Sequence, residues 1–408
     1  MYINFNYKPK ADDLVAIFHL EASGSLEEAA TAVAGESSIG SWTDLSTLKK
    51  STANKLQARV FHLDKKTGLV KIAYPLDLFE LNSIPQFLSS VGGNIFSMKM
   101  VKNLRLLDVS FPAKYVKSYL GPAFGMTGIR KILGNKNKLI LGSIIKPKVG
   151  LNPDEQAELS YKIWKNGIDL VKDDENLTSL SFNNFEERVT KVLKMLKRVE
   201  KETGKVKFYS ANVTAPPDIM IERAKFVKKM GGRVAMVDII STGLDNVQYL
   251  RKQNLGLILH GHRAGHSTFS RNPRHGISML VVAKMSRLAG IDQLHTGTVV
   301  GKMEGSKSEV SQINNFLTAK WFDKKPILPI ASGGLHPGLL PGVVEALGTD
   351  LIVNFGAGVH GHKWGSEAGA LACSQAAEAI AKKITLEKYA QTHKELDQAL
   401  KQWNEVKY

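Results

Sequence analysis

The sequence contains a single cysteine, Cys373, among 408 residues. An intrachain disulfide is therefore excluded, and an oxidising compartment would offer this chain no stabilising cross-link. No stretch of about 18 consecutive apolar residues is found, as a membrane-spanning helix would need, and the first residues lack a basic stretch followed by an apolar one. We therefore expect a cytoplasmic protein that does not interact with a membrane.

Motifs of nucleic-acid-binding proteins are also missing, namely zinc-finger spacing, an RNP-type aromatic motif and an arginine-rich arm. Yet 55 Lys and Arg residues against 38 Asp and Glu residues give a formal net charge of +17. Such a balance suits nucleic-acid binding, an anionic substrate or a plain solvated surface. Residues 190–200 place lysines at helical spacing among apolar residues, which favours the solvated surface for most of the charge.

From residue 139 onward, short apolar runs rich in β-branched residues alternate with helical patterns. Asn152 followed by Pro153 is a typical helix start, and Gly167 and Gly290 stand where helices should end. Eight parallel strands with intervening helices over about 250 residues predict a (β/α)8 barrel, whose active site lies at the C-terminal ends of the strands. The eight runs are 139–147, 167–174, 205–214, 233–240, 255–263, 293–299, 327–334 and 351–358.

The remaining residues follow other patterns, so the sequence predicts four segments. Residues 1–118 form an α+β domain, with strands near 70–75 and 104–112 and helices near 25–34 and 84–90. A linker, 119–138, leads into the barrel. The barrel itself covers 139–385, and a polar helical tail covers 386–408 and is interpreted as a surface helix.

Reactive residues collect after the first two barrel strands. Lys146 and Lys148 follow the first strand, and neighbouring cations disfavour each other's protonation, which can prepare a lysine for proton transfer. Lys172, Asp174 and Glu175 end the second strand. A buried salt-bridge cluster is one interpretation, but the two carboxylates favour a hard cation such as Mg²⁺. A lysine beside that cation makes sense if CO₂ converts its amine into an anionic carbamate.

Strands five and six add histidines and anion-binding groups. His260 and His262 point to the same side of strand five, and Arg263 is a fork donor suited to a phosphate. His295 ends strand six, and Lys302 lies in a glycine-bracketed segment that is either an ordinary turn or a mobile lid carrying a charge to the substrate.

Glycines follow the last two strands. Ser332-Gly333-Gly334 ends strand seven, and Gly356 and Gly358 flank Ala357 after strand eight. Backbone N–H groups at such glycines can face an anion, and these loops are the usual phosphate site of a barrel. Two anion sites that flank a metal suit a sugar bisphosphate.

These motifs together resemble the large chain of ribulose-1,5-bisphosphate carboxylase/oxygenase over nearly the whole sequence. The compact N-terminal domain without long insertions is most similar to the archaeal form III branch, which is linked to AMP and nucleoside metabolism and for which no small subunit is expected. The segments that carry the resemblance are GESSIGSWT (35–43), GNIF (93–96), IKPKVG (145–150), VKDDEN (171–176), HGHRA (260–264), GTVVGK (297–302) and SGG (332–334).

The resemblance implies a carbon–carbon lyase that uses Mg²⁺ and an activating CO₂. Lys172, as a carbamate, would bind Mg²⁺ with Asp174 and Glu175 and then remove the C3 proton of ribulose 1,5-bisphosphate. The resulting enediolate would attack CO₂, or O₂ in a side reaction, and the carboxylated product would be cleaved to two 3-phosphoglycerate molecules. The other implied catalytic residues are Lys302, which steadies CO₂; Glu36, which holds Lys302; His262, which assists proton transfer; and Lys146, which is tuned by Lys148 and protonates the final carbanion.

The resemblance also assigns the substrate-binding residues, which are Ser41, Trp42, Asn94, Arg263, His295, Ser332, Gly333, Gly334, Gly356 and Ala357. Of these, Ser41, Trp42 and Asn94, together with Glu36, would reach the barrel of a neighbouring subunit. The implied assembly is a homodimer with shared active sites, from which larger oligomers of dimers can be built.

Two positions depart from the family pattern. Ser41 replaces a frequent Thr and keeps the hydroxyl. Ala357 replaces a usual Gly, and would cost about 1 kcal/mol or more if its φ had to be positive.

Two alternatives remain. One is a related enolase or isomerase acting on another sugar phosphate without fixing CO₂. The other is a non-catalytic, basic nucleic-acid-binding protein. Enolases and isomerases related to the carboxylase typically lose part of the acid–base set. This sequence keeps the full set, which favours the carboxylase: Lys146, Lys172, His262, Arg263, His295 and Lys302.

Overall fold

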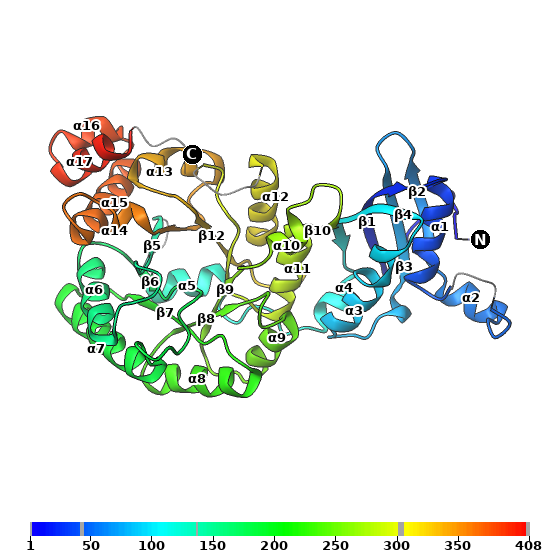
Figure 1. Cartoon of the computed structure of the whole chain (residues 1–408), viewed down its shortest axis with the longest axis horizontal. Coiled ribbons are helices and arrows are strands. Elements are labelled where there is room, and N and C mark those ends of the chain that lie inside the picture. The colour runs from blue at the N-terminus through cyan, green and yellow to red at the C-terminus, as the bar shows by residue number, and fades with distance from the viewer. Residues whose placement is uncertain (1, 41–44, 136–137, 301–305, 405–408) are drawn as a thin grey trace. The chain divides into compact units, whose positions relative to one another are not determined.

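The computed structural model describes residues 2–40, 45–135, 138–300 and 306–404, and Figure 1 follows the chain through them. The chain forms two compact units. The first comprises Met1–Gly121, Gly265–Ala289 and Trp321–Lys324, and the second Pro122–Ala264, Gly290–Lys320 and Lys325–Tyr408. The first unit therefore takes two segments from within the barrel sequence. The boundaries predicted at residues 118, 138 and 385 remain predictions.

The second unit is built on a closed barrel of eight parallel strands, which confirms the predicted fold class. Each strand lies inside one of the eight predicted runs, and β13 pairs with β5 to close the barrel. The strands in order are β5 (Ile140–Ile144), β6 (Leu170–Lys172), β7 (Phe208–Asn212), β8 (Val234–Asp238), β9 (Ile258–His262), β11 (Gln293–His295), β12 (Leu328–Ser332) and β13 (Ile352–Phe355).

An apolar layer fills the N-terminal end of this barrel. It is formed largely by the first residue of each strand, for example Ile140, Phe208 and Val234, and Ile129 of α5 (Gly125–Leu133) packs onto it. Fully burying one such side chain contributes about 1.5–3 kcal/mol. Because this end is filled by hydrocarbon, polar chemistry is left to the opposite, C-terminal end of the strands.

The helices around the barrel begin and end where the sequence indicates. Asn152 caps α6 (Pro153–Lys165) and forms a reciprocal capping box with Glu155, which satisfies backbone N–H groups at the helix start. The long helix α7 (Phe185–Thr203) buries its apolar stripe and exposes Lys194 and Lys197. Apart from two C-terminal helices, the remaining α-helices of this unit are α8 (Pro217–Lys229), α9 (Leu244–Lys252), α12 (Lys307–Thr318), α13 (Leu340–Leu347), α14 (Ala357–His360) and α15 (Ser366–Ala381).

The first unit contains a five-stranded mixed sheet in the order β10-β4-β1-β3-β2. Its helices α1 (Leu26–Glu36) and α3 (Ile84–Val91) match the predicted ones, and α2 (Lys50–Leu56) and α4 (Ala113–Lys117) are additional. The strands β3 (Leu69–Pro75) and β4 (Val101–Ser110) match the predicted runs, whereas β1 (Asp13–Ala22) and β2 (Arg59–Asp64) are additional.

The segment after β9 completes the sheet of the first unit. It contains α10 (Ser267–Ser270), β10 (Gly276–Ile277) and α11 (Met279–Ala289). β10 pairs in parallel with β4, with Ile277 opposite Leu106. Lys284 of α11 donates to Asp108 Oδ1 at 2.5 Å and to the carbonyl of Val109 at 2.8 Å. The segment that directly follows Arg263 is thus fixed to β4 by backbone pairing and by a partly buried ion pair.

The C-terminal residues form two short helices, α16 (Leu386–Ala390) and α17 (Lys394–Trp403). They are not simply a polar surface tail, because Leu396 and Ala399 are fully buried and α17 packs against α15. The ring of Trp403 stacks on His336, with 5.4 Å between the ring centroids. In the described part of the chain, no helix is both long and apolar enough to cross a membrane.

The carboxylate of Asp292 holds the N-terminal side of the barrel together. Its Oδ1 accepts hydrogen bonds from the backbone N–H groups of Phe124 at 2.7 Å and Gly125 at 2.9 Å. Its Oδ2 accepts from the backbone N–H of Leu259 at 2.9 Å and from the guanidinium of Arg251 at 2.5 Å. One buried carboxylate therefore ties α5, β9 and α9 to β11.

We expect Asp292→Ala to lower the free energy of unfolding by about 3–5 kcal/mol, because Arg251 would remain buried without its partner. Urea unfolding of the intact protein measures this loss. Asp397→Ala is the matched control, since Asp397 forms an exposed pair with Lys401 and should change stability by less than about 1 kcal/mol. Equal losses of unfolding free energy in the two variants would contradict the role of Asp292 in holding this side of the barrel together.

Candidate active site

Three lysines and two carboxylates meet at the C-terminal ends of β5 and β6. Lys146 Nζ lies 2.8 Å from Asp174 Oδ2. Lys148 Nζ and Lys172 Nζ each lie 3.9 Å from an oxygen of Glu175. The structure therefore brings together the residues that the sequence placed after strands one and two.

The Lys172 amine is the unusual member of this cluster. It is fully buried, and its Nζ makes no hydrogen bond within the described residues. Burial lowers its pKa to about 8, although the charges of Glu175, Asp174 and Asp173 act in the opposite direction. Near neutral pH, a larger share of this amine is therefore uncharged and nucleophilic than in an exposed lysine.

Glu175 stays ionised in the same place. Burial opposes its charge, but the neighbouring His262, Lys172 and Lys148 lower its pKa to about 2. His262 Nε2 lies 3.5 Å from Glu175 Oε2, and His262 Nδ1 accepts a hydrogen bond from the backbone N–H of Ala264 at 3.2 Å. Because Nδ1 accepts, the ring proton of neutral His262 resides on Nε2 and faces the carboxylate.

Asp173 is a structural residue of the site that the sequence reasoning did not identify. It is fully buried, and its carboxylate accepts from Gln156 at 2.7 Å, Tyr209 at 2.8 Å and Arg188 at 3.2 Å. It thus fixes the backbone between Lys172 and Asp174. Strand alternation was the available signal, since it turns residue 173 away from the face shared by 172 and 174.

A second group of polar side chains spans β9, β11 and β12. His260 Nε2 and His295 Nε2 are 2.9 Å apart, and His295 Nδ1 lies 2.9 Å from Ser332 Oγ. Gln293, which the sequence reasoning also did not identify, places its Nε2 3.0 Å from His260 Nδ1. Burial lowers the pKa of both histidines well below the usual range. Both rings are therefore neutral at physiological pH.

Arg263 lies at the end of β9 and is largely buried. Burial lowers its pKa to about 10, partly offset by Glu309, so it remains charged at neutral pH. A side-chain carbon at Gly297 would come within 2.6 Å of Arg263 Nη2, and Gly297 has a φ of +94°. The glycine therefore leaves room for the guanidinium beside the end of β11.

Glycines follow β12 and β13 directly at their C-terminal ends. Gly333 and Gly334 have φ values of +118° and +73°, which only glycine adopts readily. A side-chain carbon at Gly356 would lie 3.5 Å from Lys146 Cε. Ala357 is the first residue of α14 and is not among the described non-glycine residues with positive φ. The cost of about 1 kcal/mol that a positive φ would impose on Ala357 therefore does not arise.

The other predicted residues belong to the first unit or lie outside the description. Glu36 is exposed at the end of α1, and Asn94 is exposed at the start of a 3-10 turn, Asn94–Ser97. Ser41, Trp42 and Lys302 lie outside the described residues.

No ready-made metal site exists among the described residues, because no group of three His, Cys, Asp or Glu side chains is arranged to hold an ion. Asp174 and Glu175 are the carboxylates beside Lys172, and a further carboxylate, Asp238 at the end of β8, lies 4.0 Å from His262 Nδ1. A third oxygen donor would have to come from elsewhere, and the Lys172 amine, which has no hydrogen-bond partner, is the neighbouring group that can be converted into one.

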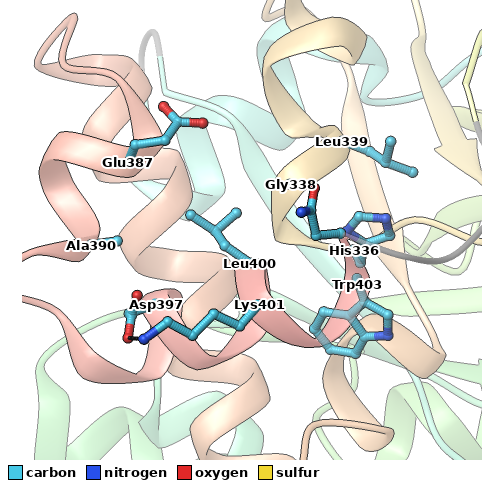
Figure 2. Close-up of a pocket in the computed structure, with 10 residues that line it drawn as sticks. His336, Gly338, Leu339, Glu387, Ala390, Asp397, Leu400, Lys401 and Trp403 are labelled. Atoms are coloured by element: carbon cyan, nitrogen blue, oxygen red, sulfur yellow. Dashed lines mark hydrogen bonds and ion pairs between the residues drawn. The ribbon is translucent and has the colours of Figure 1, made fainter.

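A separate cavity of about 550 Å³ lies beside the C-terminal helices (Figure 2). Its charged residues Asp397 and Lys401 pair with each other at 2.6 Å. It contains none of the lysine, carboxylate and histidine groups of the barrel mouth. The candidate active site is therefore the C-terminal end of the barrel strands. The lining residues are His336, Gly338, Leu339, Glu387, Ala390, Asp397, Leu400, Lys401, Trp403 and Asn404.

Comparison with known proteins agrees with this geometry along the whole chain. Residues 1–115 match the family model of the ribulose bisphosphate carboxylase large chain, N-terminal domain, and residues 125–403 match that of its catalytic domain. The ribulose bisphosphate carboxylase of Methanosarcina mazei is 48% identical over 98% of both chains. That of Methanocaldococcus jannaschii is 46% identical over 98% of this chain and 99% of its own.

Solved structures agree as well. The octameric enzyme of Pyrococcus horikoshii, in complex with sulfate ion, superposes with a TM-score of 0.96 at 46% identity, covering 100% of this chain and 97% of that one. The dimeric archaeal enzyme of Hyperthermus butylicus gives a TM-score of 0.93 at 43% identity over 99% of both chains. The chain therefore belongs to the ribulose bisphosphate carboxylase large-chain family, the enzyme family that its motifs predict.

Proposed function

We propose that this chain is a ribulose-1,5-bisphosphate carboxylase, which adds CO₂ to its substrate and cleaves the product to two 3-phosphoglycerate molecules. The observation that carries the proposal is the fully buried Lys172 amine, which has no hydrogen-bond partner among the described residues and lies beside Asp174 and Glu175 at the barrel mouth. An oxygenase side reaction, a place in nucleoside-phosphate salvage and a cytoplasmic location belong to the same proposal and rest on the family motifs.

Lys172 fits the carbamate that this family implies. The neutral amine would attack the carbon of CO₂, a nitrogen proton would leave, and a buried cation would become an anion. Its lowered pKa of about 8 supports this reaction by supplying the neutral amine. The carbamate oxygen, Asp174 and Glu175 would hold Mg²⁺, which prefers oxygen ligands. When bound, Mg²⁺ would polarise the substrate ketone and lower the barrier to enolisation.

The lysines around the carboxylates would then change partners. Lys146 and Lys148 currently neutralise Asp174 and Glu175. If those carboxylates held a cation instead, both ammonium groups would lose these ion pairs and could turn toward the mouth. Lys146 would then be free to hold the proton that ends the reaction on the carbanion of the second product. Lys172, once carbamylated, is the base proposed for the C3 proton of the substrate.

His262 is proposed to assist proton transfer during hydration and cleavage. Its Nε2 proton faces Glu175 at 3.5 Å, so the ring is already oriented by a neighbouring anion. The adjacent backbone N–H of Ala264 fixes the other ring nitrogen. To transfer a proton at Nε2, the ring must also carry a proton on Nδ1, which lies 4.0 Å from Asp238 Oδ2. The imidazolium then returns to the neutral ring when Nε2 gives up its proton.

Substrate binding is proposed at two anion sites. The buried guanidinium of Arg263 suits one phosphate, and the backbone at Gly333, Gly334, Gly356 and Ala357 suits the other. Both ring nitrogens of His295 are already engaged, so a direct bond from His295 to a phosphate requires the loss of one partner. Ser41, Trp42 and Lys302 are assigned to the substrate from their motifs.

We further propose a homodimer with shared active sites and without a small subunit. Glu36 and Asn94 would complete the barrel mouth of the partner subunit together with Ser41 and Trp42, and Glu36 would hold Lys302 there. The relatives from Hyperthermus butylicus and Pyrococcus horikoshii are described as dimeric and octameric, and these assemblies support a repeated dimer.

A labelling assay tests the activity. After incubation with CO₂ and Mg²⁺, the protein should convert ribulose 1,5-bisphosphate and ¹⁴C-bicarbonate into labelled 3-phosphoglycerate. Lys172→Met should abolish the label, while Lys194→Met, on the exposed face of α7, should retain full activity. Turnover of another sugar phosphate without label incorporation would instead establish an enolase or isomerase. Tight RNA binding at physiological salt without any turnover would establish a nucleic-acid-binding protein.

The buried Lys172 amine predicts a specific pH dependence of stability. Its folded pKa of about 8 lies below the ordinary 10.5, so between these values the unfolded chain binds more protons and the unfolding free energy rises with pH. The shift corresponds to a gain of roughly 3 kcal/mol across this window. We expect urea unfolding in CO₂-free, Mg²⁺-free buffer to show this gain as the difference between wild type and Lys172→Met. A flat difference from pH 7.5 to 10.5 would refute the lowered pKa.

Mixing two inactive variants tests the shared site. Glu36→Gln removes a group of the N-terminal domain, and Lys172→Met removes one of the barrel. When the two proteins exchange subunits, each mixed dimer has one site with both defects and one intact site, so random mixing should restore about a quarter of wild-type activity. Two wild-type controls mixed in the same way calibrate the exchange. If the exchanged mixture stays inactive, each site is built within one chain.

A further inference from the structure

Four side chains form one continuous hydrogen-bonded chain inside the barrel. It runs from Gln293 Nε2 to His260 Nδ1 at 3.0 Å, from His260 Nε2 to His295 Nε2 at 2.9 Å, and from His295 Nδ1 to Ser332 Oγ at 2.9 Å. The residues come from the adjacent strands β9, β11 and β12. Gln293 and His260 are fully buried, and His295 is 3% exposed. Water therefore has little access to compete for these bonds.

The side-chain amide of Gln293 determines which group donates in each of these hydrogen bonds. An amide nitrogen can only donate, so His260 Nδ1 must accept and the proton of its neutral ring must lie on Nε2. His260 Nε2 then donates to His295 Nε2, which leaves the His295 proton on Nδ1. That proton is donated to Ser332 Oγ. The hydroxyl hydrogen of Ser332 is consequently free to point elsewhere.

The opposite direction is disfavoured by burial. If the Gln293 amide were turned around, its carbonyl oxygen would accept from His260 and every donor in the chain would reverse. Gln293 Oε1 is buried and has no hydrogen-bond partner in the part of the chain that the structure describes. Turning the amide would place Nε2, with two N–H groups, in that position. Both N–H groups would then lack a partner while the oxygen alone was paired, and buried N–H groups without a partner are rarer than under-satisfied carbonyl oxygens.

We propose that Gln293 is a positioning residue, which acts through His260 and His295 to make Ser332 a hydrogen-bond donor toward the substrate. The identity of the substrate rests on the proposed function, whereas the direction of the hydrogen bonds from Gln293 to Ser332 does not. A donor matters because loss of the C3 proton leaves negative charge on the oxygen of the former ketone, and that oxygen can only accept. In the reversed chain, the Ser332 hydroxyl would spend its hydrogen on His295.

The direction of the chain can be read from the histidine tautomers. In protein labelled with ¹⁵N-histidine, the imidazole nitrogen shifts should place the His260 proton on Nε2 and the His295 proton on Nδ1. His260→Gln and His295→Gln variants assign the signals. Gln293→Met keeps the side-chain length and removes the donor, so both rings should move toward a mixture of tautomers. Reversed tautomers in wild type, or unchanged signals in Gln293→Met, would overturn the proposal.

A matched control separates this effect from the general loss of a buried amide. Gln375 of α15 is also buried, but its amide bonds to Glu395 and to the backbone N–H of Leu396. Gln375→Met should leave the signals of His260 and His295 unchanged. Because the tautomers are measured in the substrate-free protein, this result stands whether or not the proposed carboxylase activity is found.

A double-mutant cycle tests the functional part. Gln293→Met should lower kcat/KM for ribulose 1,5-bisphosphate about fivefold, the effect of losing one hydrogen bond. In a Ser332→Ala background, which has no hydroxyl to orient, Gln293→Met should have no further effect. An equal loss in both backgrounds would mean that Gln293 acts only through packing, and would overturn the positioning role.

Discussion

The burial of the Lys172 amine is the constraint on which the barrel mouth depends. Removing an ammonium group from water is unfavourable by several kcal/mol unless compensating charges lie close by. Asp174 and Glu175 supply these charges, and they are themselves neutralised by Lys146 and Lys148, while His262 Nε2 lies 3.5 Å from Glu175. The mouth is therefore a balanced set in which each charge is held by its neighbours. Converting one member into an anion redistributes all the others, and we propose that activation by CO₂ does so.

The rigidity of this set comes from the layer behind it. Asp173 turns away from the mouth and is held by Gln156, Tyr209 and Arg188. Asn212 of β7 donates to the backbone carbonyls of Asp174 and Glu175 at 3.2 Å and 3.1 Å. These bonds fix the backbone of residues 173–175 without using the carboxylates of Asp174 and Glu175. Chemistry and support are thus separated on the two faces of a single short segment.

The sequence predicts the barrel well because its signals are local. Apolar runs, helix caps and glycines at helix ends all lie within a few residues of the element that they define. The lysines and carboxylates after strands one and two could be predicted to meet, because the C-terminal ends of parallel strands share one edge. The same argument explains why His262, Arg263 and His295 lie at that edge. Most of the +17 charge is compatible with exposed helix faces such as that of α7.

The features that were missed have two different causes. β1 contains a continuous apolar run, Leu14–Phe18, and could have been recognised from it. β10 could not, because it has two residues and its pairing partner lies far earlier in the chain. Gln293 belongs to the same class, since a lone glutamine in a strand gives no sign of the histidine that it contacts. Pairing across the fold is decided by packing that a linear pattern does not contain.

The position of β10 in the sequence has a consequence for folding during synthesis on the ribosome. β4 is made early, yet the strand that covers its outer edge is made only after the fifth barrel strand. Until then, the nascent N-terminal sheet presents an open edge with unpaired backbone groups, which is a site where other chains can add. The first unit therefore cannot finish folding in the order in which it is translated. Its maturation must wait for much of the barrel to emerge, because residues 265–289 belong to the first unit.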